Sequence, residues 1–588
     1  MRKLYILLIL SLIILLPITG AFQSHPQAVM SYSIIFEEKS TRPLGSLGII
    51  IVIDALNKSL LEVANLTWIP WLMDNGITIL DARTVLPSAT TAAHAAMITG
   101  APPEVNGIVH TYAYNATEYH SMLPDESPIS YGYMDMLRVK TLLEAAKEAN
   151  EKVALIVSKS KLELMAGVSR AADKILILPS DVIGPGDPHD ASYPFEKRVI
   201  NVEWITNKTL ETLDEFAPYI IDGEKALIVV HYGEVDWISG ALGVFHPDTI
   251  KMVEILDQEI GRIINKIMEY NLWSRTFFIL TTDHSFVDVD INKNLLAGDI
   301  THLSAIHAEH ILVETAGLSL FIYLKHPEEL QKVVNELSQY PWVRGIWTRY
   351  PVENASGTLA DIGLNIDYAG DIFLDIRPPY YASRYLSVGA HGGTATCVVP
   401  IIFAGGTVKK GVTISNVTIM HIGATMAKFL NVTLPNATVE ALDILLPTAS
   451  VSASVEPGIA QPGQQIFLRV NYSLSETVEG AKLFVDIIDI NGSAYSSTSK
   501  NITALSGSET FVITISAEGS YNFRVYIIDP QNNVLGGTTL PVLVVKIEKA
   551  KAPIWPIVGS LLITIVLSGI LIYIPLYIRK REELHEYT

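Results

Sequence analysis

The chain has 588 residues, of which 49% are hydrophobic, and a formal net charge of −19 at pH 7. This length predicts several domains, because single hydrophobic cores rarely grow past about 250–300 residues. The negative charge argues against a surface that coats nucleic acid, since such a surface would be basic. Cys397 is the only cysteine, which excludes an intrachain disulfide and a cysteine-rich zinc site.

Two apolar segments near the chain ends predict the topology. Residues 1–21 have a basic start, an apolar run from Leu4 to Ile18 and small residues before position 22, which is typical of a secretory signal peptide; an uncleaved anchor is the alternative. Residues 552–578 carry no charge and can cross a hydrocarbon core of about 30 Å. Because basic residues follow at once, we expect residues 579–588 in the cytoplasm and the region between the two segments outside the cell.

Asn-x-Ser/Thr sequons agree with an extracellular glycoprotein. They begin at Asn57, Asn65, Asn115, Asn207, Asn354, Asn416, Asn431, Asn436, Asn471, Asn491 and Asn501. Asn57 is the poorest candidate for glycosylation, because it lies close to the site proposed below.

The first part of the chain alternates between strand and helix patterns. Leu47 to Ile53 is an unbroken aliphatic run, as in a buried parallel strand, and it ends in Asp54. A turn or capping role is the alternative for this aspartate. Leu60 to Asn75 predicts a helix, and Thr78 to Asp81 predicts a short strand.

The segment from Pro87 to Ile108 predicts a helix over about Thr91 to Ile98, ended by Gly100 and a Pro-Pro pair. Thr90 falls at the start of this helix. Unpaired backbone N–H groups and the positive end of the helix dipole gather there, so a phosphate could lie against the Thr90 hydroxyl. The alternative is that Thr90 only caps the helix.

The alternation continues to about residue 430 and predicts an α/β fold with a mostly parallel central sheet and a site along its carboxyl edge. Helices are expected at Tyr133–Asn150, Thr249–Tyr270 and Pro327–Tyr340. Strands are expected at Val153–Val157, Lys174–Leu178, Ala226–Tyr232, Thr276–Leu280, Ser319–Leu324, Ile346–Thr348, Asp371–Asp375 and Cys397–Phe403.

From about residue 449 to residue 551 strands with turn signals replace helices, which predicts an Ig-like β-sandwich that separates a catalytic domain, residues 22–448, from the membrane. The strands are expected at Ile466–Tyr472, Ala481–Ile490, Thr510–Ser516, Tyr521–Ile528 and Leu540–Ile547.

Five acidic and imidazole side chains share one placement, because each follows an aliphatic strand or lies in a glycine-flanked loop. They are Asp54, Asp236, Asp283, His284 and His391. Carboxylate and imidazole ligands suit Zn²⁺ or a similar divalent ion, although each residue taken singly could be structural. Together they predict a site for two metal ions.

The Thr90 segment resembles the nucleophile segment of the alkaline phosphatase superfamily, and most closely that of the type I phosphodiesterase/nucleotide pyrophosphatase family. In that family the nucleophilic threonine lies four residues before a histidine, which a Thr-Gly pair follows. Thr90, His94, Thr99 and Gly100 keep this spacing, and Asn106-Gly107-Ile108 resembles the His-Gly-Ile ending of the family segment. The family has a phosphate-holding asparagine where this chain has Ala93.

The resemblance covers roughly residues 45–430 and implies roles for the candidate ligands. Asp54, Thr90, Asp283 and His284 match the ligands of one metal ion, whereas Asp236 and His391 match two of the three protein ligands of the other. Gly240 occupies the position of the third, a histidine. His246 is near enough to be the replacement, and an unrelated surface role is the alternative. Weaker candidates are His231, His302, His307 and His310.

The function that the resemblance implies is hydrolysis of phosphodiester or pyrophosphate bonds through a covalent phospho-threonine, with two divalent ions, expected to be Zn²⁺, and a phosphate-ester or nucleotide-like substrate. A phosphomonoesterase or phosphoryl-headgroup transferase would use the same chemistry. The alternative from another class is a non-catalytic adhesion or sensing protein that keeps the fold. Ala93 and Gly240, which replace two family residues, favour this alternative.

Overall fold

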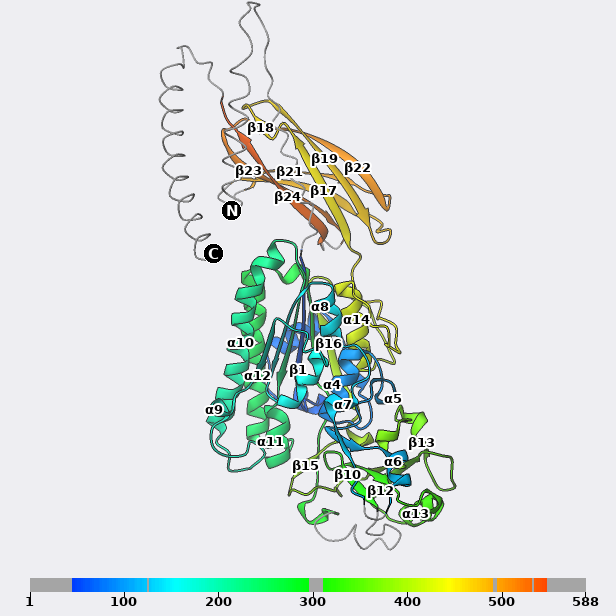
Figure 1. Ribbon diagram of the computed structural model, residues 1–588. Coiled ribbons are helices and arrows are strands. Elements are labelled where there is room, and N and C mark those ends of the chain that lie inside the picture. Colours follow the sequence, from blue (N-terminus) through cyan, green and yellow to red (C-terminus); the bar gives the residue numbers. More distant parts are fainter. Residues whose placement is uncertain (1–44, 124–125, 296–309, 490–493, 531–533, 547–588) are drawn as a thin grey trace, which may run out of the picture.

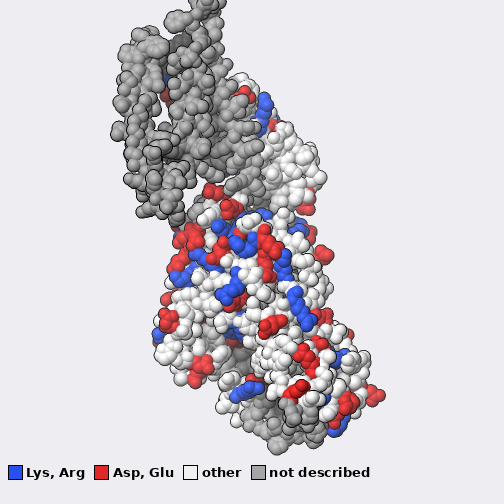
Figure 2. Space-filling view, in the orientation of Figure 1, with Lys and Arg blue, Asp and Glu red and all other residues white. Residues whose placement is uncertain are grey.

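The computed structural model describes residues 45–123, 126–295, 310–489, 494–530 and 534–546. An α/β region and a β-sandwich lie at opposite ends of this part of the chain (Figure 1). On the face shown in Figure 2, basic and acidic side chains are interspersed over the α/β region, so neither sign of charge forms a continuous area there.

The central sheet of the α/β region has seven strands in the order β2-β16-β8-β1-β7-β5-β6. β1 runs parallel to its neighbours β7 and β8, and β5 runs parallel to β6 and β7. Only β16 is antiparallel to both of its neighbours. This confirms the expected α/β core with a mostly parallel sheet. The strands are β1 (Leu47–Ile53), β2 (Ile77–Arg83), β5 (Lys152–Val157), β6 (Lys174–Ile177), β7 (Ala226–Tyr232), β8 (Thr276–Thr281) and β16 (Val398–Ala404).

Helices cover both faces of this sheet, which explains why its central strands are aliphatic without alternation. Ile49 and Ile51 of β1 pack into one core with α10 (Phe195–Ile221) and α12 (Pro247–Glu269). Ile50 and Val52 pack into a second core with α4 (Thr90–Thr99), α8 (Leu142–Glu148) and α14 (Met420–Leu430). The sequence analysis did not predict α10.

The single helix predicted over Leu60–Asn75 is wrong. The segment forms α2 (Lys58–Val63) and α3 (Trp68–Asp74). The break arises because the Asp257 carboxylate, on α12, accepts hydrogen bonds from the backbone N–H groups of Thr67, Trp68 and Ile69 at 2.9, 2.9 and 2.7 Å. A distant carboxylate thus caps α3, which a local pattern cannot reveal.

The helix predicted over Tyr133–Asn150 is also wrong, because it is two helices, α7 (Tyr133–Met136) and α8. Thr141 begins α8 with a capping box, in which its hydroxyl accepts from the Glu144 N–H and its own N–H donates to the Glu144 carboxylate. The Thr-x-x-Glu sequence is a recognised signature of a helix start, so the sequence did carry this signal.

A second sheet has the strand order β10-β11-β14-β12-β13. Three of the predicted strands, Ser319–Leu324, Ile346–Thr348 and Asp371–Asp375, belong to this sheet and not to the central one. β11 and β14 pair antiparallel, as do β12 and β14, and α13 (Leu330–Leu337) packs on them. Its strands are β10 (Ile311–Glu314), β11 (Ser319–Tyr323), β12 (Val343–Thr348), β13 (Gly357–Thr358) and β14 (Ile372–Ile376). We call it the satellite sheet.

The C-terminal region is a β-sandwich around its own hydrophobic core. One sheet has the order β17-β19-β22 and the other has the order β18-β24-β23-β20-β21. The strands are β17 (Ala449–Glu456), β18 (Ile459–Ala460), β19 (Gln465–Leu474), β20 (Lys482–Asp489), β21 (Ala494–Asn501), β22 (Ser506–Thr514), β23 (Gly519–Ile528) and β24 (Val534–Val544). Along β19 buried and exposed side chains alternate, as expected for a strand with one face on a core.

The predicted signal peptide, transmembrane segment and tail lie outside the described residues. Among the helices that are described, none combines the length and the apolar composition needed to span a bilayer.

The remaining short α-helices and strands are α5 (Pro103–Asn106), β3 (Tyr112–Tyr114), α6 (Ala116–Ser121), β4 (Ser130–Gly132), α9 (Ser180–Ile183), α11 (Glu234–Leu242), β9 (Val287–Asp288) and β15 (Gly389–Ala390).

Candidate metal centre

The topology brings the predicted ligands to one edge of the central sheet. β8, β1 and β7 are adjacent and parallel, so the residues that follow their carboxyl ends meet. Asp54 follows β1, Asp283 and His284 follow β8, and Asp236 lies in the first turn of α11 just after β7. The fifth residue, His391, comes from the loop after β15.

Thr90 lies where this edge meets the start of α4. The N-cap residue of that helix is Ala89, and no side chain caps it, so the structure does not give the Thr90 hydroxyl a capping role. Thr90 is 2% exposed, and its Oγ1 lies 3.4 Å from His284 Nε2. The hydroxyl therefore faces the candidate ligands.

Asp54, Asp283 and His284 form one group of ligand atoms, which we call the nucleophile half because it adjoins Thr90. His284 Nε2 lies 3.4 Å from Asp54 Oδ1 and 3.4 Å from Asp283 Oδ2. Both oxygens are buried without a hydrogen-bond partner. His284 Nδ1 donates to the backbone oxygen of Ser285 at 3.1 Å. In the neutral ring Nε2 is then unprotonated, and its lone pair faces the two carboxylates.

The pKa shifts of Asp283 and His284 show that this half has little positive charge near its ligand atoms. Burial and the neighbouring Asp54 carboxylate raise the pKa of Asp283 well above its usual range. Burial lowers the pKa of His284, so its imidazole is neutral. Electron pairs that face one another in a buried site favour a cation between them, and a ligating histidine typically donates its other N–H to a carbonyl, as His284 does. These residues fit a divalent metal ion.

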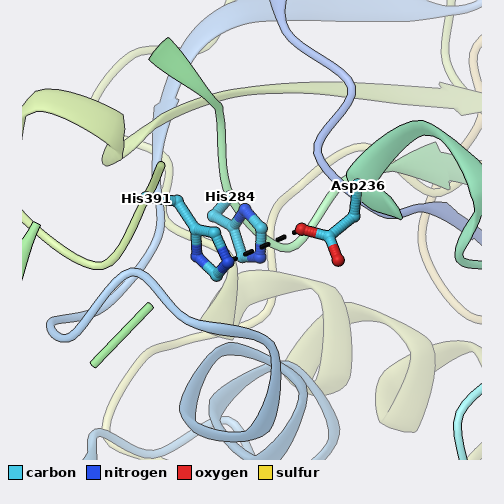
Figure 3. A group of neighbouring side chains, drawn as sticks. All are labelled: Asp236, His284 and His391. Carbon is cyan, nitrogen blue, oxygen red and sulfur yellow. Dashed lines mark ion pairs between the residues drawn. The ribbon is translucent and has the colours of Figure 1, made fainter. Parts of the chain in front are cut away.

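Asp236, His284 and His391 form the second group, which we call the distal half (Figure 3). His391 Nε2 lies 3.5 Å from Asp236 Oδ1, and the two imidazole rings stack with centroids 3.6 Å apart. His391 Nδ1 donates to the Ser88 backbone oxygen at 2.9 Å, so its Nε2 faces the site. Burial, with the neighbouring His284, lowers the pKa of His391 to about 3, which keeps it neutral.

Lys159 is a residue of this site that the sequence analysis missed. Its ammonium lies 2.6 Å from Asp54 Oδ2 and 2.6 Å from Asp236 Oδ2, and its side chain is 9% exposed. Although burial opposes ionisation, the two carboxylates raise the pKa of Lys159, so it stays charged. It follows β5, the parallel neighbour of β7, and this strand-end position was the signal that could have found it.

Two further histidines support the nucleophile half. His231 Nε2 lies 3.0 Å from Asp54 Oδ2, and its Nδ1 lies 2.9 Å from the Ser158 hydroxyl. His94 Nδ1 donates to the Thr90 backbone oxygen at 2.8 Å and lies 3.6 Å from Asp283 Oδ2. His231 thus contacts a candidate ligand without joining either group.

The structure does not bring His246 into either group of ligands within the described residues. Its side chain is 38% exposed, and its Nδ1 accepts from the Asp248 N–H at 3.2 Å as the N-cap of α12. His310 lies near the satellite sheet and contacts Glu329, whereas His302 and His307 lie outside the described residues. Gly240, on α11, faces Phe286 and Ser387.

Ala93 is fully buried in α4 and offers no polar atom to the site. The first N–H groups of a helix lack intrahelical acceptors, so α4 still presents backbone donors at its start. An oxyanion at Thr90 would have to rely on those donors and on cations.

The sequence profile of the family described as type I phosphodiesterase/nucleotide pyrophosphatase matches residues 48–390. No curated protein matches the chain. Murine ectonucleotide pyrophosphatase/phosphodiesterase 5, in an inactive form in complex with AMP, is a similar solved structure, with a TM-score of 0.51 and 15% identity over 68% of this chain and 100% of that chain.

A second similar structure is phosphonoacetate hydrolase from Sinorhizobium meliloti 1021 in complex with phosphonoformate. It has a TM-score of 0.50 and 15% identity over 66% of this chain and 95% of that chain. At these identities the two structures establish the fold.

Proposed function

The chain belongs to the type I phosphodiesterase/nucleotide pyrophosphatase family, and from this premise we propose that it hydrolyses phosphodiester or pyrophosphate bonds through a covalent phospho-threonine at Thr90. One observation carries the proposal. The Thr90 hydroxyl contacts His284, whose bare Nε2 faces two buried carboxylate oxygens that have no partner.

Asp54, Asp283 and His284 would hold a divalent ion beside Thr90, and we propose zinc because carboxylate and imidazole ligands suit it. Asp236 and His391 would hold a second ion, with one protein ligand fewer than the family pattern. When bound, a divalent ion supplies the positive charge that lowers the pKa of the threonine hydroxyl, stabilises the leaving oxygen and activates water.

The chain's own residues define the geometry of the reaction. The Thr90 hydroxyl loses its proton as its oxygen forms a bond to phosphorus, while the bond from phosphorus to the leaving oxygen breaks on the opposite side and the leaving oxygen takes up a proton from water. A water molecule then attacks phosphorus and loses a proton, the bond to Thr90 breaks, and the Thr90 oxygen takes up a proton to become a hydroxyl again. Backbone N–H groups at the start of α4 would bind a non-bridging oxygen in place of the amide that Ala93 lacks.

The substrate that we propose is a phosphate ester or a nucleotide-like small molecule. AMP, bound in one structural relative, supports this class. A phosphomonoesterase or phosphoryl transferase would use the same residues. Turnover of a chromogenic phosphodiester compared with the matching monoester separates these activities.

The test uses the full-length protein in detergent. We expect it to hydrolyse bis(p-nitrophenyl) phosphate, to lose this activity to a chelator and to regain it with zinc. Acid quenching followed by mass spectrometry is expected to find a phosphate adduct on the peptide that contains Thr90. A metal-loaded protein that turns over neither ester would favour the non-catalytic alternative, which Ala93 and Gly240 support.

We also propose that the protein is anchored in the membrane by residues 552–578, with the catalytic region outside the cell and the β-sandwich as a spacer. The signal-like start and the basic flank support this topology. External protease should remove an epitope in the catalytic region of intact cells and spare one at the C-terminus. A C-terminal epitope that is cleaved from outside would reverse the orientation.

A further inference from the structure

The gap between the two halves of the metal centre is bridged by a side chain of the protein. Lys159 reaches from the end of β5, and its ammonium lies at hydrogen-bond distance from one oxygen of Asp54 and one oxygen of Asp236. The ammonium also lies 5.7 Å from the centre of the Trp237 ring. Burial and three neighbours fix it in this position.

The ammonium contacts one aspartate of each half at the same distance, but it leaves the two halves with different sets of ligands. It lies 2.6 Å from Asp54 Oδ2 in the nucleophile half and 2.6 Å from Asp236 Oδ2 in the distal half. The nucleophile half still offers Asp54 Oδ1 and Asp283 Oδ2, both buried without a hydrogen-bond partner, together with His284. The distal half offers only the other oxygen of Asp236 and His391 beside the shared His284.

The distal half also lacks a ligand, although space for one exists. A Cβ atom at Gly240 would lie 3.7 Å from Ser387 Oγ and 3.9 Å from Phe286 Cζ, which are ordinary contact distances. Packing around the Cβ position therefore does not explain the glycine. The distal half therefore has no imidazole at position 240, and the Lys159 ammonium lies beside Asp236.

We propose that the Lys159 ammonium is a resident cation between the two halves, so that the ammonium and a second divalent ion exclude each other at the distal half, which has fewer ligands left, and the chain holds one ion tightly, at Asp54, Asp283 and His284. This inference rests on the proposed metal centre. Formal charge agrees with it, because one divalent ion and one ammonium together balance the three carboxylates of Asp54, Asp236 and Asp283. A second ion gains access to Asp236 only when Lys159 leaves it.

The experiment measures metal binding rather than turnover. Full-length protein in detergent is stripped with a chelator, titrated with zinc by calorimetry, and analysed for bound zinc by mass spectrometry after desalting. We expect one tightly bound ion per wild-type chain. Lys159→Met should bind a second ion at least about tenfold more tightly than the wild type does, within the range by which groups around a metal change its affinity.

Lys161→Met is the matched control. Lys161 is half-buried near the same carboxylates but forms no ion pair with them within the described residues. Its substitution removes an equal charge without opening the contact to Asp236, so one tight ion should remain. Equal gains in second-ion affinity for the two variants would overturn the exclusion, because general charge would then explain them.

Gly240→His keeps the inference testable if Lys159→Met does not fold. With Lys159 present this variant should still hold a single tight ion, and the double variant with Lys159→Met should hold two. Two tight ions in the wild type or in Gly240→His would overturn the inference and leave the proposed hydrolase intact. Absence of any bound ion would overturn both proposals.

Discussion

The two halves of the metal centre share His284 but rest on different supports. In the nucleophile half, Asp54 and Asp283 follow the adjacent parallel strands β1 and β8 and are fully buried. In the distal half, Asp236 comes from the first turn of α11. His391 comes from a loop, and its backbone oxygen accepts from the N–H of Leu318, the residue before β11 of the satellite sheet. The central sheet alone fixes the nucleophile half, whereas the distal half depends on several elements.

Electrostatics divide the three aspartates by their contact with Lys159. Burial and Asp54 raise the pKa of Asp283, whereas Lys159 overcomes the effect of burial and lowers the pKa of Asp54 and of Asp236. A carboxylate with a raised pKa lacks a neighbouring cation, and one with a lowered pKa has one. The comparison teaches that the carboxylate without a cation, Asp283, lies in the half nearer Thr90, and that the distal half has no carboxylate of this kind.

The largest effect is expected at the nucleophile. Thr90→Ala should lower kcat at least about 1,000-fold, because removal of a nucleophile leaves only binding and electrostatic contributions. Folding and tight zinc binding should persist, since Asp54, Asp283 and His284 remain. Thr90→Ser should retain measurable turnover. Phosphodiesterase assays with circular dichroism and zinc content check this, and near wild-type turnover in Thr90→Ala would remove the covalent mechanism.

The next largest effect tests directly whether the two halves contribute differently to zinc binding. Asp283→Asn should weaken the tight zinc ion by more than the roughly 10- to 100-fold typical of an outer contact, because it removes a buried charge at that ion. Asp236→Asn should leave the tight ion in place. Zinc titration of both variants measures the difference. Equal losses in the two variants would mean that the halves are equivalent.

The nucleophile half was predictable from the sequence because its ligands follow aliphatic strands. Parallel strands end at one edge, so the residues after β1 and β8 had to meet. α4 was marked by its run of small and apolar residues and by Gly100, which ends it. The Thr90 hydroxyl and the ligands of this half are where the pattern placed them. The pattern also predicted Asp236 and His391, but not how they are held.

Lys159 also follows a strand, but its position alone did not single it out, because lysine is not a typical metal ligand. Only the pairing of β5 with β7 brings it to Asp236. The satellite sheet was missed for a related reason, since a strand pattern does not say which sheet the strand joins. The cap that Asp257 provides for α3 is likewise a tertiary contact.

A smaller effect sharpens the picture of the distal half. Asp375 supports the His391 loop, because its Oδ1 accepts from the Thr394 N–H at 3.0 Å. Burial raises its pKa to about 6. The folded state then binds more protons than the unfolded state between about pH 4 and pH 6, so this carboxyl's contribution to stability falls as pH rises through that range and is constant above it.

Asp375→Asn removes this titration. The free energy of unfolding of the variant relative to the wild type should therefore rise by on the order of 2 kcal/mol between about pH 4.5 and pH 7. Denaturation of both proteins at the two pH values measures this change. Asp371→Asn, at the residue that precedes the same strand β14, is the control, and a change of equal size there would assign the effect to the satellite sheet as a whole.

The smallest effect concerns His246, which the sequence analysis proposed as the replacement ligand of the distal half. In the structure it caps α12 through Nδ1 and is partly exposed. His246→Ala should therefore cost only about 0.5–1 kcal/mol of stability, the low end for loss of an N-cap. His246→Asn should recover most of that loss, since asparagine is a favoured cap. Zinc stoichiometry should not change in either variant. If His246→Ala instead bound one equivalent less of zinc, the His246 imidazole would have to be a ligand in the distal half. The two halves would then differ only in which residue supplies the third ligand.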